Sequence, residues 1–478
     1  MSVRKKVAII GSGCSGIGAL WALKSTDHEV HLYEIADRLG GHTNTVSFKH
    51  GEERVAVDTG FIVLNTDTYP NFIAFLKAIG VPTVSTDMTF GVSRDKVRFN
   101  QFALDLLADE GESEQDPSGC GSEASQPDKP SHPKSIGAYL DQNNYSEAFR
   151  TNYLIPMTAA VWSTAPDKVS LEFPAITLIR FMWNHHLLST IASRPQWMTI
   201  PGGSQQYIDA VMADVPREHV HISEGVKEVG NVKDGRIRIV LSSGKEDLYD
   251  HVIMATHGDQ ALNILYETAS GEEREILSGF KFSSNTAVLH SDLSLMPLRP
   301  EAWSSWNYIT TSSSTTNQVS SVCLTYWMNL LQHIPRSNFG DVLVTLNPLI
   351  QPDPSKVQGS WTYHHPLYND TAIRSQKQLP KIQNTRGISY AGAWTKYGFH
   401  EDGFSSGVKV AIEHLGAKLP FTFVDSTFSR GRKPKLGWLD HVMRVFIYII
   451  DIILETLGGR QSSMTGHKGH TAPKYKRQ

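Results

Sequence analysis

Residues 6–16 read KVAIIGSGCSG, in which a short apolar run is followed at once by the pattern G-x-G-x-x-G. The run is typical of a buried strand, and residues 15–24 carry helix-forming side chains. Residues 29–33, EVHLY, are a second strand-like run, so strand, helix and strand follow one another within about 30 residues. This order predicts the βαβ unit of a doubly wound α/β domain.

The glycines of this pattern fit a dinucleotide site. Gly11 permits a tight turn, Gly13 lets the backbone approach a pyrophosphate, and Gly16 lets the helix pack closely on the strand. Ser15 lies in the first turn of the expected helix, where the free N–H groups attract an anion. Glu34 ends the second strand, 18 residues after Gly16, where a carboxylate binds ribose hydroxyls. We therefore expect these five residues to contact a dinucleotide.

Further motifs identify the type of dinucleotide. Residues 34–41 have the form E-x-x-x-R-x-G-G, in which Arg38 can pair with phosphate. Other landmarks are residues 58–61 (DTGF), 201–203 (PGG), 250–256 (DHVIMAT) and 392–407. With them the sequence resembles the flavin-containing amine oxidase superfamily from about residue 5 to about residue 415, outside an insertion. It looks closest to a bacterial and fungal branch of predicted NAD/FAD-binding oxidoreductases. The resemblance implies FAD as the cofactor.

The resemblance also implies which residues contact FAD. Besides the glycine pattern and Glu34, they are Arg38, Gly40, Gly41, His42, Thr43, Gly60, Val226, Gly392, Glu401, Asp402 and Gly403. A helix starting near Gly403 would direct its positive end at the pyrimidine edge of the flavin. Phe399 stands where amine oxidases place an aromatic residue of the substrate cage. Phe399, His400 and His365 are candidates to line the flavin, and no catalytic acid or base is assigned.

The sequence contains one dinucleotide pattern, whereas flavin reductases carry a second one for NAD(P)H. Electrons are therefore expected to come from the substrate. We expect an FAD-dependent oxidoreductase that moves hydride from an apolar, lipid-like substrate to flavin N5, as an oxidase or a desaturase. Three alternatives stay open. They are an amine oxidase proper, a redox-neutral flavin isomerase of unsaturated lipids, and a flavin-bound scaffold without turnover.

Composition excludes several other classes of protein. The 45 basic and 48 acidic residues give a net charge of −3, which argues against nucleic acid as a partner. The 3 cysteines form neither a disulfide framework nor a C-x-x-C site, as is typical of a reduced, cytosol-facing chain. Residues 1–13 do not have the form of a signal peptide.

Two further patterns carry little weight. Residues 403–407 match G-x-S-x-G, but the preceding strand ends 14 residues before Ser405, too far for the nucleophile of a hydrolase. The adjacent pairs His185-His186 and His364-His365 point in different directions on a helix or a strand, so neither pair can ligate a metal jointly. We therefore predict no metal site.

The chain of 478 residues is long enough for two or three domains. We expect a discontinuous FAD-binding domain at residues 1–80, 201–265 and 386–417. A substrate domain with a mixed sheet and helices would take residues 81–200 and 266–385. Residues 109–133, rich in Ser, Gly, Pro and acids, should be a disordered insertion, and residues 458–478 a flexible basic tail. The oligomeric state stays open.

Residues 436–457 have the pattern of an amphipathic helix. Asp440, Arg444, Asp451 and Glu455 fall within one stripe of about 60° on a helical projection, and apolar residues cover most of the rest. Basic residues flank the segment, as expected next to anionic lipid headgroups. We expect this helix to lie in one leaflet or beside the active-site mouth, on the cytoplasmic side of a membrane. A single membrane span and a helix packed on protein are the alternatives.

Truncation after Gly437 should release the protein from membranes without loss of FAD, because the truncation removes the amphipathic stripe but no dinucleotide motif. Full-length and truncated proteins can be compared by sedimentation with vesicles that contain anionic lipid, with flavin absorbance as the second readout. The expectation fails if the full-length protein stays in the supernatant at low salt without detergent.

Overall fold

The structure is a computed structural model that describes residues 3–94, 98–100, 135–146, 149–150, 154–162, 173–185, 195–312 and 319–428. It also describes residues 438, 442, 445, 446 and 449, which are helical and exposed. The predicted insertion at 109–133, the tail at 458–478 and the rest of the predicted helix at 436–457 lie outside the described residues. Within the described part, no helix is both long enough and apolar enough to cross a membrane.

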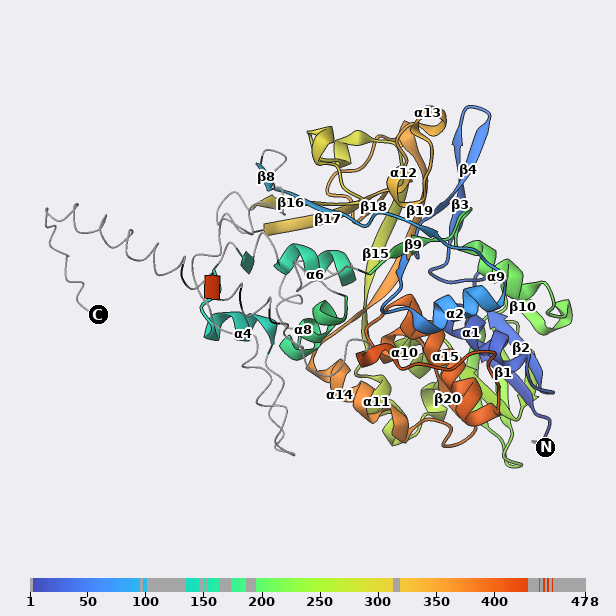
Figure 1. Cartoon of the computed structure of the whole chain (residues 1–478). Coiled ribbons are helices and arrows are strands. Elements are labelled where there is room, and N and C mark those ends of the chain that lie inside the picture. The colour runs from blue at the N-terminus through green and yellow to red at the C-terminus, as the bar shows by residue number, and fades with distance from the viewer. Residues whose placement is uncertain are drawn as a thin grey trace, which may run out of the picture.

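A five-stranded parallel sheet forms the body at the N-terminus (Figure 1). Its strand order is β10 (Val220–Ile222), β2 (Glu29–Glu34), β1 (Lys6–Ile10), β14 (His251–Met254) and β20 (Ile388–Tyr390). The five strands come from three stretches of chain far apart in sequence, and together with the helices they confirm the predicted α/β class.

The two faces of this sheet are covered differently. On one face, Val7, Ile9 and Leu32 pack with helices α1 (Cys14–Leu23) and α15 (His400–Leu415) in one apolar core. On the other face, Ala8 and Ile10 pack with the antiparallel sheet β11 (Val226–Asn231), β12 (Ile237–Leu241) and β13 (Glu246–Tyr249). Part of the second face is thus covered by strands instead of the helices that a purely doubly wound domain would carry.

Glycine allows α1 and α15 to touch backbone to backbone. A Cβ atom at Gly407 would collide with the carbonyl group of Ser15, and a Cβ atom at Gly18 would lie 2.9 Å from the carbonyl oxygen of Phe404. In both cases the distance from the added Cβ atom to the carbonyl oxygen is shorter than the contact distance between carbon and oxygen atoms in packed proteins. Any larger residue at these two positions would push the helices apart.

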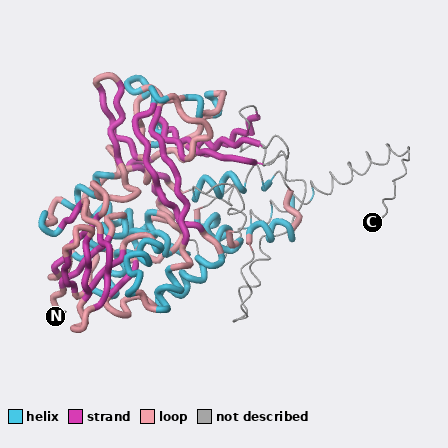
Figure 2. The backbone as a smooth tube through the Cα atoms, turned by 180° about the vertical axis from the view of Figure 1, so that it is seen from behind, coloured by secondary structure: helices cyan, strands magenta, loops and turns pink. Residues whose placement is uncertain are grey.

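The second body is a seven-stranded mixed sheet (Figure 2). Its order is β19 (Val357–Leu367), β15 (Lys281–His290), β18 (Leu343–Leu346), β17 (Val319–Trp327), β16 (Trp306–Ser312), β7 (Phe90–Arg94) and β8 (Arg98–Asn100). Only β16 and β7 pair in parallel among these described strands. Figure 1 shows helices α4 (Ile136–Gln142), α6 (Ile155–Trp162) and α8 (Ala175–Asn184) grouped next to this sheet.

The remaining elements connect these parts. The small sheets contain β3 (Thr45–His50), β4 (Glu53–Asp58), β5 (Leu64–Asn65), β6 (Val84–Ser85) and β9 (Trp197–Thr199). The further helices are α2 (Pro70–Ala78), α9 (Gln205–Met212), α10 (Gly258–Leu265), α11 (Gly271–Leu277), α12 (Met328–Leu331), α13 (Arg336–Phe339) and α14 (Asp370–Gln378). The boundaries proposed above for the two domains stay predictions.

A buried ion pair fastens the last strand of the parallel sheet. Arg386, just before β20, donates from Nε and Nη2 to the two carboxylate oxygens of Glu273 on α11, at 3.0 and 2.9 Å. The Glu273 side chain is only 1% exposed, and it also accepts a hydrogen bond from the Tyr390 hydroxyl at 2.6 Å. Removing one partner would leave a buried charge without compensation.

Arg386→Ala should therefore lower the free energy of unfolding by about 3–5 kcal/mol. Arg236→Ala is the control, because Arg236 pairs with Asp234 at the surface and is 49% exposed, so its loss should have a much smaller effect. Urea denaturation of the FAD-loaded proteins measures both values. Similar, small effects of the two substitutions would contradict the role given to Arg386.

Candidate active site

The glycine loop between β1 and α1 has the geometry of an anion site. Gly11 has a φ of +102°, and a Cβ atom there would lie 2.7 Å from the carbonyl oxygen of Ala255. A Cβ atom at Gly13 would meet nothing within 4 Å, so the space above this residue is open. Helix α1 begins directly after it, and the N–H groups of a first helical turn have no partner within the helix. The loop therefore leaves room and donors for a pyrophosphate.

The carboxylate of Glu34 lies beside this loop. Its Oε2 accepts hydrogen bonds from the backbone N–H and the hydroxyl of Ser12, at 2.9 and 2.6 Å. Gly40 also donates its N–H to the Ser12 carbonyl oxygen at 3.1 Å, so the double-glycine loop packs on the first one. Arg38 donates to the carbonyl oxygens of Gly41 and Thr43, at 2.7 and 3.0 Å. In this structure Arg38 thus holds the shape of the second loop, and its contact with phosphate stays a prediction.

His42 follows the double glycine and is half-buried, and its Nε2 atom is buried without a hydrogen-bond partner. Its ring lies 5.1 Å from the His365 ring, 5.0 Å from Tyr363 and 6.3 Å from His257. A buried imidazole nitrogen without a partner is costly, which is the situation expected where a ligand atom completes the site. This unpaired nitrogen and the open space above Gly13 both fit a bound dinucleotide cofactor.

The histidines around His42 are neutral. Burial lowers the pKa of His42 well below its usual value, and it lowers the pKa of His257 and of His365 to about 4. The Asn285 amide nitrogen lies 2.9 Å from His365 Nδ1 and acts as the donor, so the ring proton of His365 is on Nε2. We call His42, His257 and His365 the histidine cluster. It can donate hydrogen bonds without bringing a positive charge.

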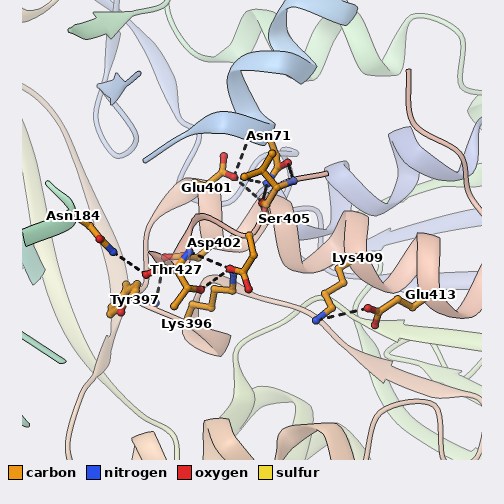
Figure 3. Close-up of polar contacts among 12 residues, drawn as sticks. Asn71, Asn184, Lys396, Tyr397, Glu401, Asp402, Ser405, Lys409, Glu413 and Thr427 are labelled. Atoms are coloured by element: carbon orange, nitrogen blue, oxygen red, sulfur yellow. Dashed lines mark hydrogen bonds and ion pairs between the residues drawn. The ribbon is translucent and has the colours of Figure 1, made fainter. Parts of the chain in front are cut away.

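The two carboxylates at the start of α15 bind protein groups. Glu401 accepts hydrogen bonds from Asn71 Nδ2, the Phe72 N–H and the Ser405 hydroxyl, each at 2.8 Å, and so ties α15 to α2 (Figure 3). Asp402 accepts from the N–H groups of Phe399 and Tyr397, at 3.0 and 3.2 Å. Burial raises the pKa of Glu401 to about 7 and that of Asp402 to about 6. Both carboxylates position the helix start, and a direct contact of either with FAD stays a prediction.

The other predicted positions lie around the same loops. The Thr43 hydroxyl is hydrogen-bonded to the hydroxyl of Tyr207 at 2.6 Å. Position 60 must be glycine, because a Cβ atom there would collide with the carbonyl group of His42. A Cβ atom at Gly403 would strike Cys14 Sγ, so the first turns of α15 and α1 meet. Gly392 donates its N–H to the Ser406 hydroxyl at 2.8 Å. Val226 is buried at the start of β11.

The structure separates the three residues that we expected to line the flavin. Phe399 stacks on Phe181 with ring centroids 5.0 Å apart. His400 stacks on Phe61 at 3.7 Å and bonds the Tyr207 hydroxyl through Nε2 at 3.0 Å. His365 alone of the three belongs to the histidine cluster. A cavity of about 20 Å³ next to Phe399, Glu401 and Asp402 has room for one water molecule.

Sequence reasoning missed His257, Asn285 and Tyr363 at this site. His257 directly follows the DHVIMAT strand, and that position after a parallel strand was a usable signal. Asn285 and Tyr363 face each other across the register of β15 and β19. No local pattern indicates such a pairing, because the two strands lie far apart in the sequence.

Comparisons with known proteins identify relatives of this chain. The family model of the flavin containing amine oxidoreductases matches residues 14–291. The flavin-dependent L-tryptophan oxidase RebO of Lentzea aerocolonigenes is 22% identical over 284 residues, which cover 55% of this chain and 56% of the relative. The chain thus spans little more than half the length of that protein.

Solved structures share the fold. The CLA-producing fatty acid isomerase from P. acnes superposes with a TM-score of 0.59 at 13% identity, covering 87% of this chain and 99% of the other. Cyclohexylamine oxidase from Brevibacterium oxydans gives a TM-score of 0.58 at 14% identity, covering 85% and 98%. At such low identity these matches establish the fold alone.

Gly13→Val should give a folded protein that has lost FAD. The valine meets no protein atom at Cβ, but it fills the space that the pyrophosphate needs. Gly271→Val is the matched control, because Gly271 also stands at the start of a helix and has an equally open Cβ position. Visible absorbance measures bound flavin, and circular dichroism of the FAD-free forms measures folding. Retained FAD in Gly13→Val would remove the role given to this glycine.

Proposed function

The chain belongs to the flavin-containing amine oxidoreductase family, and on this basis we propose that it is an FAD-dependent oxidoreductase that removes hydride from an apolar, lipid-like substrate. FAD, when bound, supplies the hydride acceptor at N5. The substrate would lose a hydride from a C–H bond next to N5 and a proton from the adjacent atom to water, so that the single bond between these two atoms becomes a double bond. The residues of the chain supply the binding, the orientation and the exclusion of water.

The observation that carries the proposal is the apolar surroundings of Phe399. Residues from α4, α6 and α8 form one apolar cluster together with Tyr368 and the side of Phe399. Trp162 lies at its centre, with ring contacts at 4.7 Å to Phe173 and 4.4 Å to Phe181. The Trp162 indole N–H also donates to the Tyr397 carbonyl oxygen at 2.9 Å, which fixes the cluster to the loop before α15. An acyl chain beside this loop would exchange water for aromatic contacts.

The same surroundings disfavour an amine as substrate. A protonated amine requires a carboxylate or an open aromatic face. Glu401 and Asp402 are engaged by protein N–H groups, as described above. One face of the Phe399 ring is covered by the nearly parallel ring of Phe181, at an interplanar angle of 10°. Both carboxylates are therefore already hydrogen-bonded to the protein, and one face of Phe399 is unavailable to a cation.

The histidine cluster suits a redox reaction on an uncharged substrate. Neutral His365 can donate from Nε2, and neutral His42 can donate or accept at its unpaired nitrogen. Both groups can hold polar atoms of a substrate or cofactor while the site stays without a positive charge. They are positioning groups in this proposal, and no proton transfer is assigned to them.

Two of the structural neighbours represent the main alternatives. The fatty acid isomerase matches the redox-neutral variant of the proposal, and cyclohexylamine oxidase matches an amine oxidase. We also propose that residues 436–457 place the protein on the cytoplasmic surface of a membrane, where a lipid-like substrate would be found.

The expected outcome is that long-chain unsaturated lipids bleach the flavin of the purified protein anaerobically, whereas primary amines and NADPH do not. Phe399→Ala should lower the second-order rate constant of this reduction roughly 10- to 100-fold, because burial of a phenyl ring contributes about 1.5–3 kcal/mol. Phe339→Ala is the matched control, since Phe339 is also half-buried but packs in the seven-stranded body. Stopped-flow absorbance measures all rates.

Fast bleaching by amines alone would favour the amine oxidase instead. Rapid bleaching by NADPH would mean that a pyridine-nucleotide site had been overlooked. Conversion of the lipid double bond without net flavin reduction would identify the isomerase. If no compound class bleaches or is converted, the flavin-bound scaffold without turnover is left.

A further inference from the structure

Five ionisable side chains gather along the outer edge of the parallel sheet, beside β2. Glu29 and His31 lie on β2, His219 ends a short 3-10 helix, His221 lies on the edge strand β10, and Glu224 follows it. Among the residues that the structure describes, Glu29, His31 and His219 have ligand atoms that all lie within 4.8 Å of one another. No step of the proposed function uses these residues.

Four of the five side chains form a linear series of contacts. Glu29 Oε1 lies 3.1 Å from His31 Nε2. His31 Nδ1 lies 3.2 Å from His221 Nε2. His221 Nδ1 lies 3.2 Å from Glu224 Oε2. Each imidazole therefore uses both of its nitrogens, and a carboxylate stands at each end of the series.

The hydrogens in this series do not suffice for its contacts. Ionised carboxylates only accept, and each neutral imidazole carries one N–H group, so two hydrogens serve three contacts. One contact consequently joins two lone pairs unless a proton or a metal ion is bound there as well. If Glu224 holds the proton on His221 Nδ1, then His221 Nε2 accepts from His31 Nδ1, and His31 Nε2 presents its lone pair to Glu29.

In that arrangement, the contact that lacks a hydrogen lies between His31 Nε2 and Glu29, and His219 lies close to both side chains. The His219 ring lies 4.5 Å from the His31 ring, on the side of Glu29. One potential ligand atom each of His31, Glu29 and His219 thus lies within 4.8 Å of the other two. Metal-bound histidine characteristically donates its other N–H to a neighbouring acceptor, and His31 has that acceptor in His221.

We propose that Glu29, His31 and His219 bind one divalent metal ion of the borderline type, with Zn²⁺ as the best match. Two imidazoles and one carboxylate are a common protein ligand set for Zn²⁺, with water in the fourth position. The His31 side chain is 12% exposed and that of Glu29 36% exposed, so the ligands are partly sheltered and the fourth position is open to solvent. The ion would fasten the short edge strand β10 to β2.

Neighbouring groups support the ligands. His221 stacks on Tyr33 with ring centroids 4.3 Å apart, and the Tyr33 hydroxyl bonds that of Tyr249 at 2.6 Å. Arg4 and Lys6 are two cations near Glu29. Arg4 lies 3.8 Å from Glu29 but is 70% exposed, so it can move aside. Lys6 is paired with Asp247 at 2.8 Å.

This site is contrary to the prediction, made from the sequence, that the chain has no metal site. That prediction considered adjacent histidines, which diverge. Glu29 and His31 are two residues apart on β2 and so share a face, and His219 ends the 3-10 helix directly before β10. The pattern E-x-H in a strand, with further histidines just before and within its neighbouring strand, was the usable signal.

The test is titration of the untagged, FAD-loaded, full-length protein with Zn²⁺, in competition with a chromophoric chelator. We expect one Zn²⁺ per chain with a dissociation constant in the micromolar range or below, and a raised melting temperature on binding. His219→Ala and, separately, Glu29→Gln should each weaken binding at least about tenfold. His50→Ala, at an exposed histidine of β3, should leave it unchanged. Co²⁺ in place of Zn²⁺ should give visible d–d absorption bands.

Absence of stoichiometric binding, or equal binding by wild type and both ligand variants, would overturn the proposal. Loss of the bound ion on truncation after Gly437 would also overturn it, because that result would assign binding to the tail with His467 and His470. Flavin absorbance and the melting temperature of the metal-free forms show whether each variant is folded. Flavin content should be the same in all of them, so this test is independent of the proposed substrate.

Discussion

The backbone contact between α1 and α15 is the constraint on which the candidate site depends. Glycine at positions 18 and 407 lets the two helices approach until carbonyl groups meet Cα atoms. Gly403 and Cys14 then bring the first turns of both helices together. Two sets of free N–H groups consequently lie at one place, although they come from opposite parts of the chain. The same contact places the loop before α15, with its aromatic surroundings, beside the glycine loop.

Sequence reasoning predicted the α/β class, the family and the FAD cofactor because these depend on local patterns. The glycine spacing around residue 13 and the acidic residue at the end of β2 lie within about 30 residues of each other. The surrounding space explains why each of these positions is glycine. The start of α15 could also be placed, since a short strand and a glycine-rich segment precede it. Propensity and periodicity are sufficient for features of this kind.

The remaining features could not be predicted, because they join segments far apart in the sequence. His42, His257 and His365 come from three such segments and meet only when β15 and β19 pair beside the double-glycine loop. Phe399 and His400 are neighbours in sequence, yet Phe399 packs against the aromatic cluster of α4, α6 and α8, whereas His400 stacks on Phe61. A third case is the Glu29, His31 and His219 trio, which depends on β10 adding to the sheet edge.

The order of the strands has a consequence for how the chain folds as it leaves the ribosome. The ribosome synthesises β1 and β2 first. However, β14 pairs with β20 on its outer side, and the glycine face of α1 packs against α15, and both β20 and α15 are synthesised near the end of the chain. Closing loops of several hundred residues is slow compared with local contacts. The parallel sheet is therefore completed only after synthesis has passed α15, and until then its apolar edge and helix face are open to chaperones.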